Sequence, residues 1–176
     1  LAERGGFGYW SHQPNRRVGG VASSANGLLS RLEPRDVLDH PLPGRVKGRG
    51  LLLARFGDGD DGLVVAVAHL SLGAASRHSQ LAFIGELLAD HRHAVLMGDF
   101  NCLADSAEMA LLYQRTRLQP PGHAVPTFPA WRPQRAIDHI LVSADLGPGE
   151  MQAQAAAQSD HLALSLQLDV PESALI

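Results

Sequence analysis

The amino-acid sequence predicts a single α/β domain, because apolar runs of strand length stand next to an amphipathic helix. With 176 residues, the chain is long enough for one domain with a substantial core. Residues 49–57 (RGLLLARFG) and 62–70 (GLVVAVAHL) are nearly continuous apolar runs around the turn GDGDD, which is typical of a β-hairpin. Residues 75–90 carry leucine and isoleucine at spacings of three and four, which predicts a helix. We therefore treat residues 1–176 as one domain.

Shorter patterns predict the elements that precede this hairpin. Residues 7–13 have the aromatic character of a strand, and residues 26–34 read as a strand that ends at a proline. Between them, residues 14–20 are predicted to form a polar loop that ends in glycine. Residues 35–43 alternate weakly and contain two prolines, which favours a short edge strand.

After the helix, the sequence predicts a buried strand, a second helix and a long loop. The apolar run Ala94–Met97 stops at a glycine and is too short for a helix, so a strand is expected. Residues 104–114 favour a helix with Asp105 or Ser106 as its N-cap. Residues 116–134 are rich in proline, and loops of this length are often functional. The last strands are expected at 136–143 and 162–168, and residues 150–157 form either a strand or an irregular alanine-rich segment.

Composition and charge narrow the classes of function. The net charge of −3 and the pI near 6.3 argue against a strong, sequence-independent nucleic-acid binder, which is usually basic. A phosphoester substrate stays possible, because an acidic site attracts its own metal cation. The single cysteine, Cys102, excludes an internal disulfide. No apolar run is long enough to cross a bilayer and no leader follows Leu1, so we expect a soluble protein, with a cytoplasmic location slightly favoured.

The stretch HAVLMGDFN (93–101) carries the clearest chemical signal. Asp99 and Asn101 occupy alternate positions, so an extended chain presents both on one face. A carboxylate beside a carboxamide at the end of a strand suits a water nucleophile: the Asp accepts a proton or holds a cation, and the Asn orients the water or the phosphoryl oxygens. Taken alone, GDFN is also typical of an ordinary turn after a strand.

Other polar side chains occupy similar places in the predicted strands. His69 lies near the end of one strand, Asp138 lies inside another, and Asp160 and His161 precede the last. Mixed α/β sheets place ligands at strand ends, and carboxylates with histidines suit Mg²⁺ or Mn²⁺ better than zinc. The alternatives are a satisfied buried histidine at 69 and a plain loop at 160–161. The absence of HExxH, CxxC, P-loop and GxSxG motifs argues against zincins, redox proteins, nucleotide-binding folds and serine hydrolases.

The order of these motifs resembles the endonuclease/exonuclease/phosphatase superfamily (deoxyribonuclease I-like). AHLSL, GDFN, IDHILVS and SDH follow one another as in that family, and NGLLSR (26–31) is similar to its "GNALLSR" strand. The resemblance covers about residues 19–168. It implies a four-layer αββα sandwich, with two mixed β-sheets face to face and helices outside. It also implies metal-dependent hydrolysis of a phosphoester.

The resemblance assigns expected roles around an attacking water. Asp99 would orient or deprotonate that water and bind the metal, and Asn101 would position the water and the phosphate. Asp160 would be a further metal ligand. The ion would be Mg²⁺ or Mn²⁺, acting as a Lewis acid on the phosphate and helping the leaving oxygen.

The resemblance also assigns two histidines to the phosphate. His161 would contact the scissile phosphate and stabilise its developing charge, and Asp138 would hold His161 through its other ring nitrogen. His69 would lie on the opposite side of the phosphate as a hydrogen-bond donor or general acid. His139 should point to the other face of its strand, so we expect it to be structural.

One part of the family pattern has no counterpart in the sequence. Members of the family begin with a strand bearing an Asn, a helix, and a strand ending in a metal-binding Glu of the "QEV" kind. The chain begins with LAERGGFGYW, so the first strand-helix-strand is expected to be missing, and Glu3 lies in a stretch typical of a helix end. The sequence therefore allows two functions: a metal-dependent phosphoester hydrolase, or an inactive truncated domain that only binds partners.

Candidate substrate contacts lie mainly in the long loop. Trp131 is expected to stack on a base, sugar or lipid, and Arg132 or Arg135 to meet a phosphate. A tryptophan that only covers the edge of the sandwich is the alternative. Through the resemblance, Asn26 is a further candidate. The sequence does not distinguish nucleic acid, a phospholipid headgroup or a small phosphodiester as substrate, and it does not predict an oligomeric state.

Overall fold

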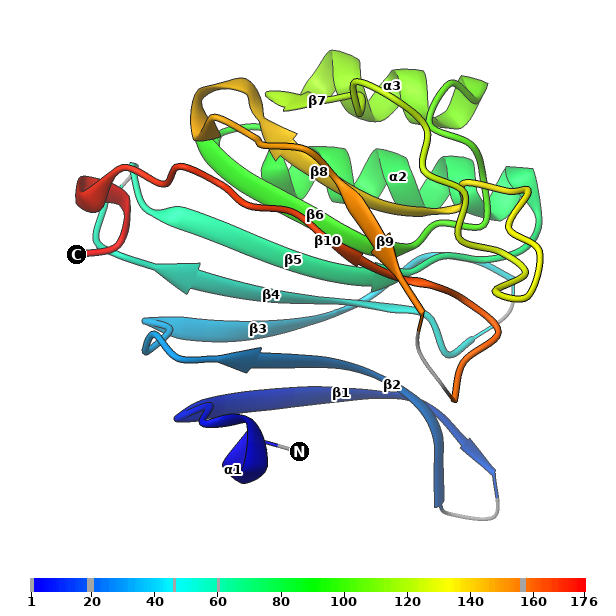
Figure 1. Ribbon diagram of the computed structural model, residues 1–176, viewed down its shortest axis with the longest axis horizontal. Coiled ribbons are helices and arrows are strands. Elements are labelled where there is room, and N and C mark those ends of the chain that lie inside the picture. The colour runs from blue at the N-terminus through cyan, green and yellow to red at the C-terminus, as the bar shows by residue number, and fades with distance from the viewer. Residues whose placement is uncertain (1, 19–20, 46, 60, 156–157) are drawn as a thin grey trace.

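The fold is built around a mixed sheet of six strands. It is seen in a computed structural model that describes residues 2–18, 21–45, 47–59, 61–155 and 158–176 (Figure 1). The strands follow the order β3-β4-β5-β6-β8-β7 across the sheet. Their bounds are β3 (Asp36–Pro41), β4 (Gly50–Phe56), β5 (Leu63–His69), β6 (His93–Asp99), β7 (Leu118–Gln119) and β8 (Asp138–Ser143).

The pairing of these strands follows from the lengths of their connections. β4 and β5 form the antiparallel hairpin that the sequence predicts, and β3 pairs with β4 at the sheet edge. β6 runs parallel to β5, because helix α2 (Ala74–Leu88) carries the chain back between them. β8 is antiparallel to β6 and places the start of one strand against the end of the other.

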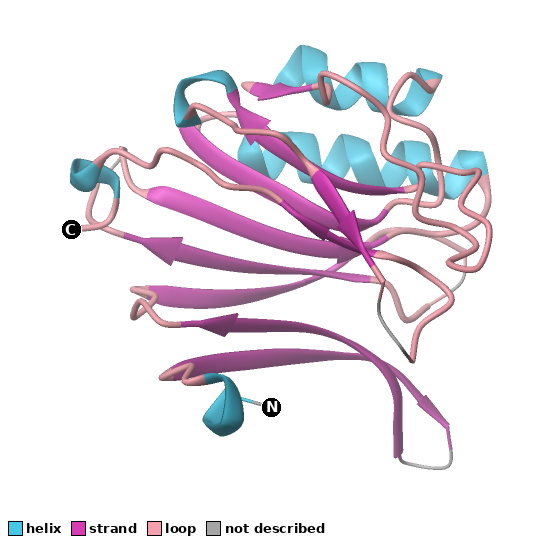
Figure 2. Cartoon of the chain, in the orientation of Figure 1, coloured by secondary structure: helices cyan, strands magenta, loops and turns pink. Residues whose placement is uncertain are grey.

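The helices cover one face of the sheet (Figure 2). Helix α2 and helix α3 (Ala107–Arg115) bury Leu81, Ile84 and Leu112 against the sheet. Leucine and alanine side chains of β4, β5 and β6 alternate toward this face and complete its core. None of the described helices is long and apolar enough to span a bilayer.

Two antiparallel pairs lie on the other face of the sheet. They are β1 (Tyr9–Val18) with β2 (Val21–Ser30), and β9 (Gln152–Gln154) with β10 (Ala163–Ser165). On this face, Leu28 of β2 and side chains of the C-terminal segment pack against the sheet in a second apolar cluster. Its members include Leu28, Phe56, Val65, Val95, Val142, Leu166 and Leu168. Three short helices complete the chain: α1 (Ala2–Gly5), η1 (Ala144–Leu146) and η2 (Glu172–Ala174).

The structure confirms the α/β fold class, the hairpin, the edge strand, the central strand and both predicted helices. One layer of strands is the six-stranded mixed sheet. Among the described residues, the layer that faces it consists of the two antiparallel pairs. Ser106 occupies the N-cap position of α3, although its side chain makes no capping hydrogen bond.

Several boundaries differ from the sequence prediction. β2 spans Val21–Ser30 rather than 26–34, and β7 lies within the loop expected over 116–134. β9 is limited to Gln152–Gln154, and residues 156 and 157 lie outside the described residues.

The polar loop expected over 14–20 is wrong for most of its length, because β1 continues to Val18 and pairs with β2. Register shifts after Pro14 and after Arg16 accommodate the proline in this ladder; residues 19 and 20 lie outside the described residues. The last ladder is shorter than 162–168, since β9 offers β10 only three partners.

Gly98 makes close packing possible at the end of the central strand. Its φ is +138°, a backbone conformation that side-chain-bearing residues rarely adopt. A Cβ atom added here would lie 1.9 Å from the carbonyl oxygen of Ala68 on neighbouring β5. Only glycine therefore fits at the position directly before Asp99.

We expect Gly98→Ala to lower the free energy of unfolding by at least about 2 kcal/mol, because it adds backbone strain and a clash with β5. Urea denaturation followed by circular dichroism measures the change. The matched control is Gly8→Ala, since an added Cβ there meets no atom within 4 Å and φ is not positive. Equal stability of the two variants would contradict this account of Gly98.

Candidate active site

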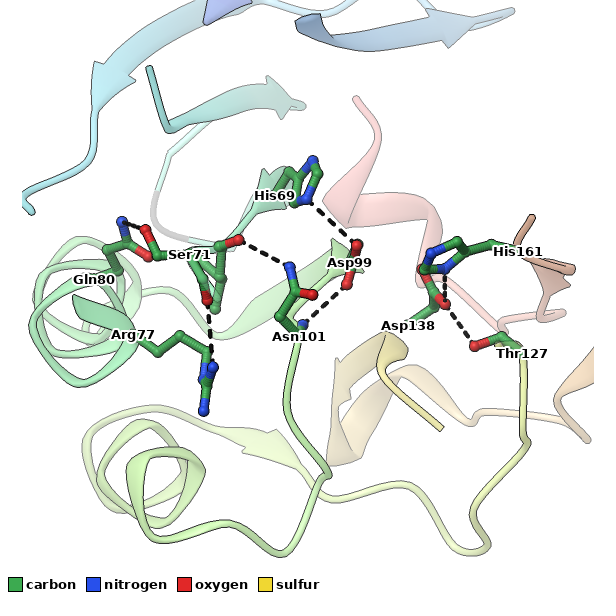
Figure 3. Close-up of polar contacts among 10 residues, drawn as sticks. His69, Ser71, Arg77, Gln80, Asp99, Asn101, Thr127, Asp138 and His161 are labelled. Atoms are coloured by element: carbon green, nitrogen blue, oxygen red, sulfur yellow. Dashed lines mark hydrogen bonds and ion pairs between the residues drawn. The ribbon is translucent and has the colours of Figure 1, made fainter. Parts of the chain in front are cut away.

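Three polar side chains line up across the ends of three neighbouring strands. In the sheet register His69 of β5 stands beside Asp99 of β6, and Asp99 stands beside Asp138 of β8. All three alternate toward the face opposite the helices, because their strand neighbours Ala68, Gly98 and His139 take the other positions. Residues 30 or more apart in sequence are thus brought to one edge, as the sequence predicted (Figure 3).

His69 and Asp99 form a polar pair. His69 Nε2 lies 3.3 Å from Asp99 Oδ2. Burial lowers the pKa of His69, and the positive charge of Arg49 lowers it further against the opposing effect of Asp99. Burial also raises the pKa of Asp99, although the Asn101 backbone N–H and His69 favour the carboxylate. The pair therefore combines a neutral imidazole with a carboxylate of increased basicity.

Asp138 holds the second histidine. His161 Nδ1 donates to Asp138 Oδ2 at 2.7 Å, and the Thr127 hydroxyl donates to the same oxygen at 2.5 Å. The ring of Phe128 lies 4.9 Å from that of His161, centroid to centroid. Burial disfavours the charged imidazole, but the hydrogen bond and charge of Asp138, with Asp99 and Asp160, outweigh it and raise the pKa of His161. This Asp–His contact agrees with the expected one.

Asn101 is held in one orientation by contacts on both sides. Its backbone N–H donates to Asp99 Oδ1 at 2.9 Å, and its side-chain Nδ2 donates to the Leu70 carbonyl at 3.0 Å. Its φ of +55° is left-handed, which Asn tolerates better than most residues. Asn101 is therefore fixed beside Asp99, but by a turn rather than by simple strand alternation.

A buried network supports the loop that receives Asn101 (Figure 3). Gln80 of α2 accepts from the Ser71 N–H at 2.9 Å and donates to the Ser71 hydroxyl at 3.0 Å. Arg77 donates to the Ser71 and Leu72 carbonyls and pairs with Glu108 of α3, Nη2 to Oε1 2.7 Å. Both helices thus fix the segment that follows His69.

The predicted loop residues lie around this cluster with less fixed geometry. Asp160 is exposed, and its backbone carbonyl accepts from the Ala130 N–H at 2.7 Å. Trp131 is 78% exposed, and Arg132 and Arg135 are exposed as well. The guanidinium of Arg135 lies 5.9 Å from the centre of the Phe128 ring, which itself contacts His161.

Asn26 has a different position from the one expected of a substrate contact. It is buried, and its amide donates to Gln13 Oε1 at 3.0 Å, the Gly50 carbonyl at 2.8 Å and the Val67 carbonyl at 3.3 Å. These bonds join the β1-β2 pair to β4 and β5. His139 is buried and bonds to the Cys102 carbonyl at 2.8 Å, which agrees with the expected structural role.

Two residues of the cluster were not found by sequence reasoning. Arg49 precedes β4, and its half-buried guanidinium is close enough to Asp99 and His69 for their charges to interact. Thr127 reaches Asp138 from the proline-rich loop. Neither residue stands in a motif, and only the pairing of β4 with β5 and the path of the loop bring them here.

The donor set suits a hard divalent cation. Ligand atoms of Asp99, Asp138 and His161 lie within 4.8 Å of one another. Asp138 Oδ2 and His161 Nδ1 are bonded to each other, and the Asp99 oxygens face the Asn101 N–H and His69. The second Asp138 oxygen and the remaining lone pairs of Asp99 are therefore the available carboxylate donors. Mg²⁺ commonly takes one or two carboxylates and keeps waters, which fits this arrangement.

Comparison with known proteins finds a matching family model and related folds. The model of the Endonuclease/Exonuclease/phosphatase family matches residues 1–161. Among curated protein sequences none matches.

Several solved structures share the fold at low sequence identity. An endonuclease/exonuclease/phosphatase from Beutenbergia cavernae is 20% identical with a TM-score of 0.77, covering 97% of this chain and 55% of its own. The mannosyl-6-phosphatase of Bacteroides thetaiotaomicron is 16% identical with a TM-score of 0.65, and the match covers 90% of this chain and 76% of that protein. A Staphylococcus aureus beta toxin with bound magnesium is 13% identical with a TM-score of 0.61, and the match covers 93% of this chain and 78% of that protein. The chain thus spans about half the length of the Beutenbergia protein.

We expect Asp138→Asn to lower the pKa of His161, because the hydrogen bond and the charge that stabilise its imidazolium are lost or weakened. NMR titration of the His161 ring in EDTA measures the change, and Asp36→Asn, remote on β3, is the control. In the native protein the raised pKa stabilises the fold below the unfolded value near pH 6.5, and this contribution disappears as the pH rises through the folded pKa. An unchanged His161 titration in Asp138→Asn would contradict the assignment.

Proposed function

The chain belongs to the endonuclease/exonuclease/phosphatase family, and we propose that it hydrolyses a phosphoester with a divalent metal ion. The observation that carries the proposal is the row of His69, Asp99 and Asp138 across three strands, with His161 held by Asp138. The proposal is supported by this row because two carboxylates and, with His161, two imidazoles gather there; they would serve as proton acceptor, metal ligand and phosphate contacts. Phosphoryl transfer needs these groups, since its catalysis depends on positioning and on charge stabilisation.

Asp99 would bind or deprotonate the attacking water. Its raised pKa makes the carboxylate a better proton acceptor than an exposed Asp. Asn101 is fixed two residues away and would orient the water and a phosphate oxygen. The water oxygen bonds to phosphorus, one P–O ester bond breaks, and the departing oxygen takes a proton, so that an alcohol and a phosphate product leave.

Three side chains would hold the phosphate. Protonated His161 uses Nδ1 on Asp138 and has Nε2 left to donate to a phosphate oxygen. Arg49 brings a permanent positive charge near Asp99. His69 lies on the other side of Asp99 and would donate a hydrogen bond to the leaving oxygen, or act as general acid once it has taken up a proton.

Asp99 and Asp160 are the proposed metal ligands, with the second oxygen of Asp138 as a further donor. Asp99 belongs to the carboxylate and imidazole cluster, and Asp160 contributes to the field that acts on His161. When bound, Mg²⁺ or Mn²⁺ supplies Lewis-acid stabilisation of the phosphoryl charge. The remaining positions would be taken by water.

The substrate would be a nucleic acid, a phospholipid headgroup or a small phosphodiester. The similar structures include a mannosyl-6-phosphatase and a sphingomyelinase C from Streptomyces griseocarneus, so this fold serves several phosphoesters. Trp131, Arg132 and Arg135 are exposed in the loop that reaches His161 through Phe128, which supports them as contacts to the rest of the substrate.

We expect hydrolysis of bis-p-nitrophenyl phosphate to depend on Mg²⁺ and to fall at least about 100-fold in Asp99→Asn, since the proton acceptor is removed. Release of nitrophenolate with Mg²⁺, with Mn²⁺ and with EDTA measures the rate. Asp58→Asn is the matched control, because that carboxylate is 88% exposed and remote from the site.

Two results would contradict the proposal that the protein is a phosphoester hydrolase. One is activity that EDTA and Asp99→Asn leave intact. The other is the absence of activity in a protein whose melting temperature Mg²⁺ does not raise, because a formed metal site must stabilise the folded state that binds the ion. The second result would favour the domain that only binds partners.

We expect Trp131→Ala to raise KM for bis-p-nitrophenyl phosphate about fivefold, because stacking on an aromatic group is worth about 1 kcal/mol or more. The matched control is Trp10→Ala, since Trp10 is 64% exposed on β1 against 78% for Trp131. Steady-state kinetics with both variants measure the effect. If KM for Trp131→Ala equals the native value, Trp131 does not contact the substrate and only covers the edge of the sandwich.

A further inference from the structure

Two adjoining cavities run along β8 from the catalytic cluster. The first has a volume of about 350 Å³ and includes Asp138 in its lining. The second has a volume of about 430 Å³ and extends past Ile140 to Val142 of the same strand. Both cavities share the wall formed by residues 120–123 and by Met151. Together they form one groove, called here the β8 groove, that begins at Asp138.

We propose that the β8 groove binds an uncharged, apolar ester group of the phosphoester substrate. The proposal rests on the proposed function and adds a substrate class to it. Asp138 both lines the groove and holds His161, so a phosphate at His161 places one of its ester groups at the groove entrance. Each cavity lies within the size range of small-molecule sites, about 300–1,000 Å³.

The lining of the groove is predominantly apolar along its length. Leu103 and Val125 line the cavity that includes Asp138, and Ile140, Val142 and Leu166 line the second cavity. Ile140 and Val142 alternate with His139 and Leu141, so their side chains point to the same face of the sheet as Asp138. An alkyl or aryl group would therefore exchange water for hydrocarbon contacts along the strand.

The charges of the groove argue against a polyanion. None of its described lining residues is Lys or Arg. Its carboxyl groups are those of Asp105, Asp138 and Glu150, and its other titratable side chains are His123 and His139. A second phosphate, such as the next one in a nucleic-acid strand, would meet three carboxyl groups with no Lys or Arg beside it. Arg132 and Arg135 belong to a different loop surface and do not line the groove.

The outer wall of the groove is held in place before any ligand binds. Pro120 and Pro121 restrict the backbone there, and they directly follow β7, which pairs with β8 through Leu118 and Gln119. Leu118 is buried in the main core. A site whose shape is already fixed loses less conformational entropy when a ligand binds. The groove can therefore select among substrates that differ in this ester group.

The experiment compares p-nitrophenyl methyl, butyl and octyl phosphates, which share one scissile bond to p-nitrophenol. We expect kcat/KM with Mg²⁺ to rise about two- to fourfold for each methylene group that enters the groove. Leu103→Glu, which places a charge in the groove wall, and Ala124→Trp, which narrows it, should reduce this dependence on chain length. The matched control is Leu32→Glu, since Leu32 and Leu103 are 53% and 49% exposed; it should keep the native dependence.

A separate binding measurement distinguishes failure of the groove from failure of the hydrolase. Isothermal titration calorimetry with methyl phosphate and octyl phosphate, kept below the micelle concentration of the latter, gives the ratio of their affinities without turnover. Hydrolysis that is independent of chain length, or equally dependent in native protein and both groove variants, would overturn the groove and leave the proposed function standing. If no ester is hydrolysed, the hydrolase fails, and the groove stands only if octyl phosphate binds at least about tenfold more tightly than methyl phosphate and Leu103→Glu removes that preference.

Discussion

The in-register pairing of β5, β6 and β8 at one edge of the sheet is the constraint on which the rest of the site depends. Strand pairing sets neighbouring residues about 5 Å apart, so the register alone brings His69, Asp99 and Asp138 together. A shift of one residue in β6 would turn Asp99 into the helix-covered core. Gly98 allows this register, because the neighbouring Ala68 carbonyl occupies the space of any side chain.

The two histidines have different surroundings, which shift their pKa values in opposite directions. His69 lies between Asp99 and Arg49, and burial together with the cation lowers its pKa, so it is neutral near pH 7. His161 is instead bonded to Asp138, and the nearby carboxylates raise its pKa. One sheet edge thus holds a neutral and a more readily protonated imidazole on either side of Asp99. Such a separation of pKa values is typical of acid and base partners at active sites.

The core and the outer segments contribute differently to the candidate site. The central sheet holds the row of His69, Asp99 and Asp138, and the two helices support the loop beside Asn101 through buried contacts such as those of Arg77 and Gln80. The segments after β7 and β8 instead surround the site with exposed aromatic, basic and apolar groups. Because packing fixes the first group and solvent surrounds the second, one fold can keep its reaction while its loops select different phosphoesters.

The sequence by itself determined the α/β class, most element positions and the central members of the cluster, because apolar periodicity and the GDFN, IDH and SDH motifs are local signals. Tertiary structure decided what depends on non-local pairing. It placed Arg49 and Thr127 at the site, buried Asn26 between layers, and continued β1 through Pro14. Local pattern cannot predict such contacts, since they depend on which distant strand or loop becomes the neighbour.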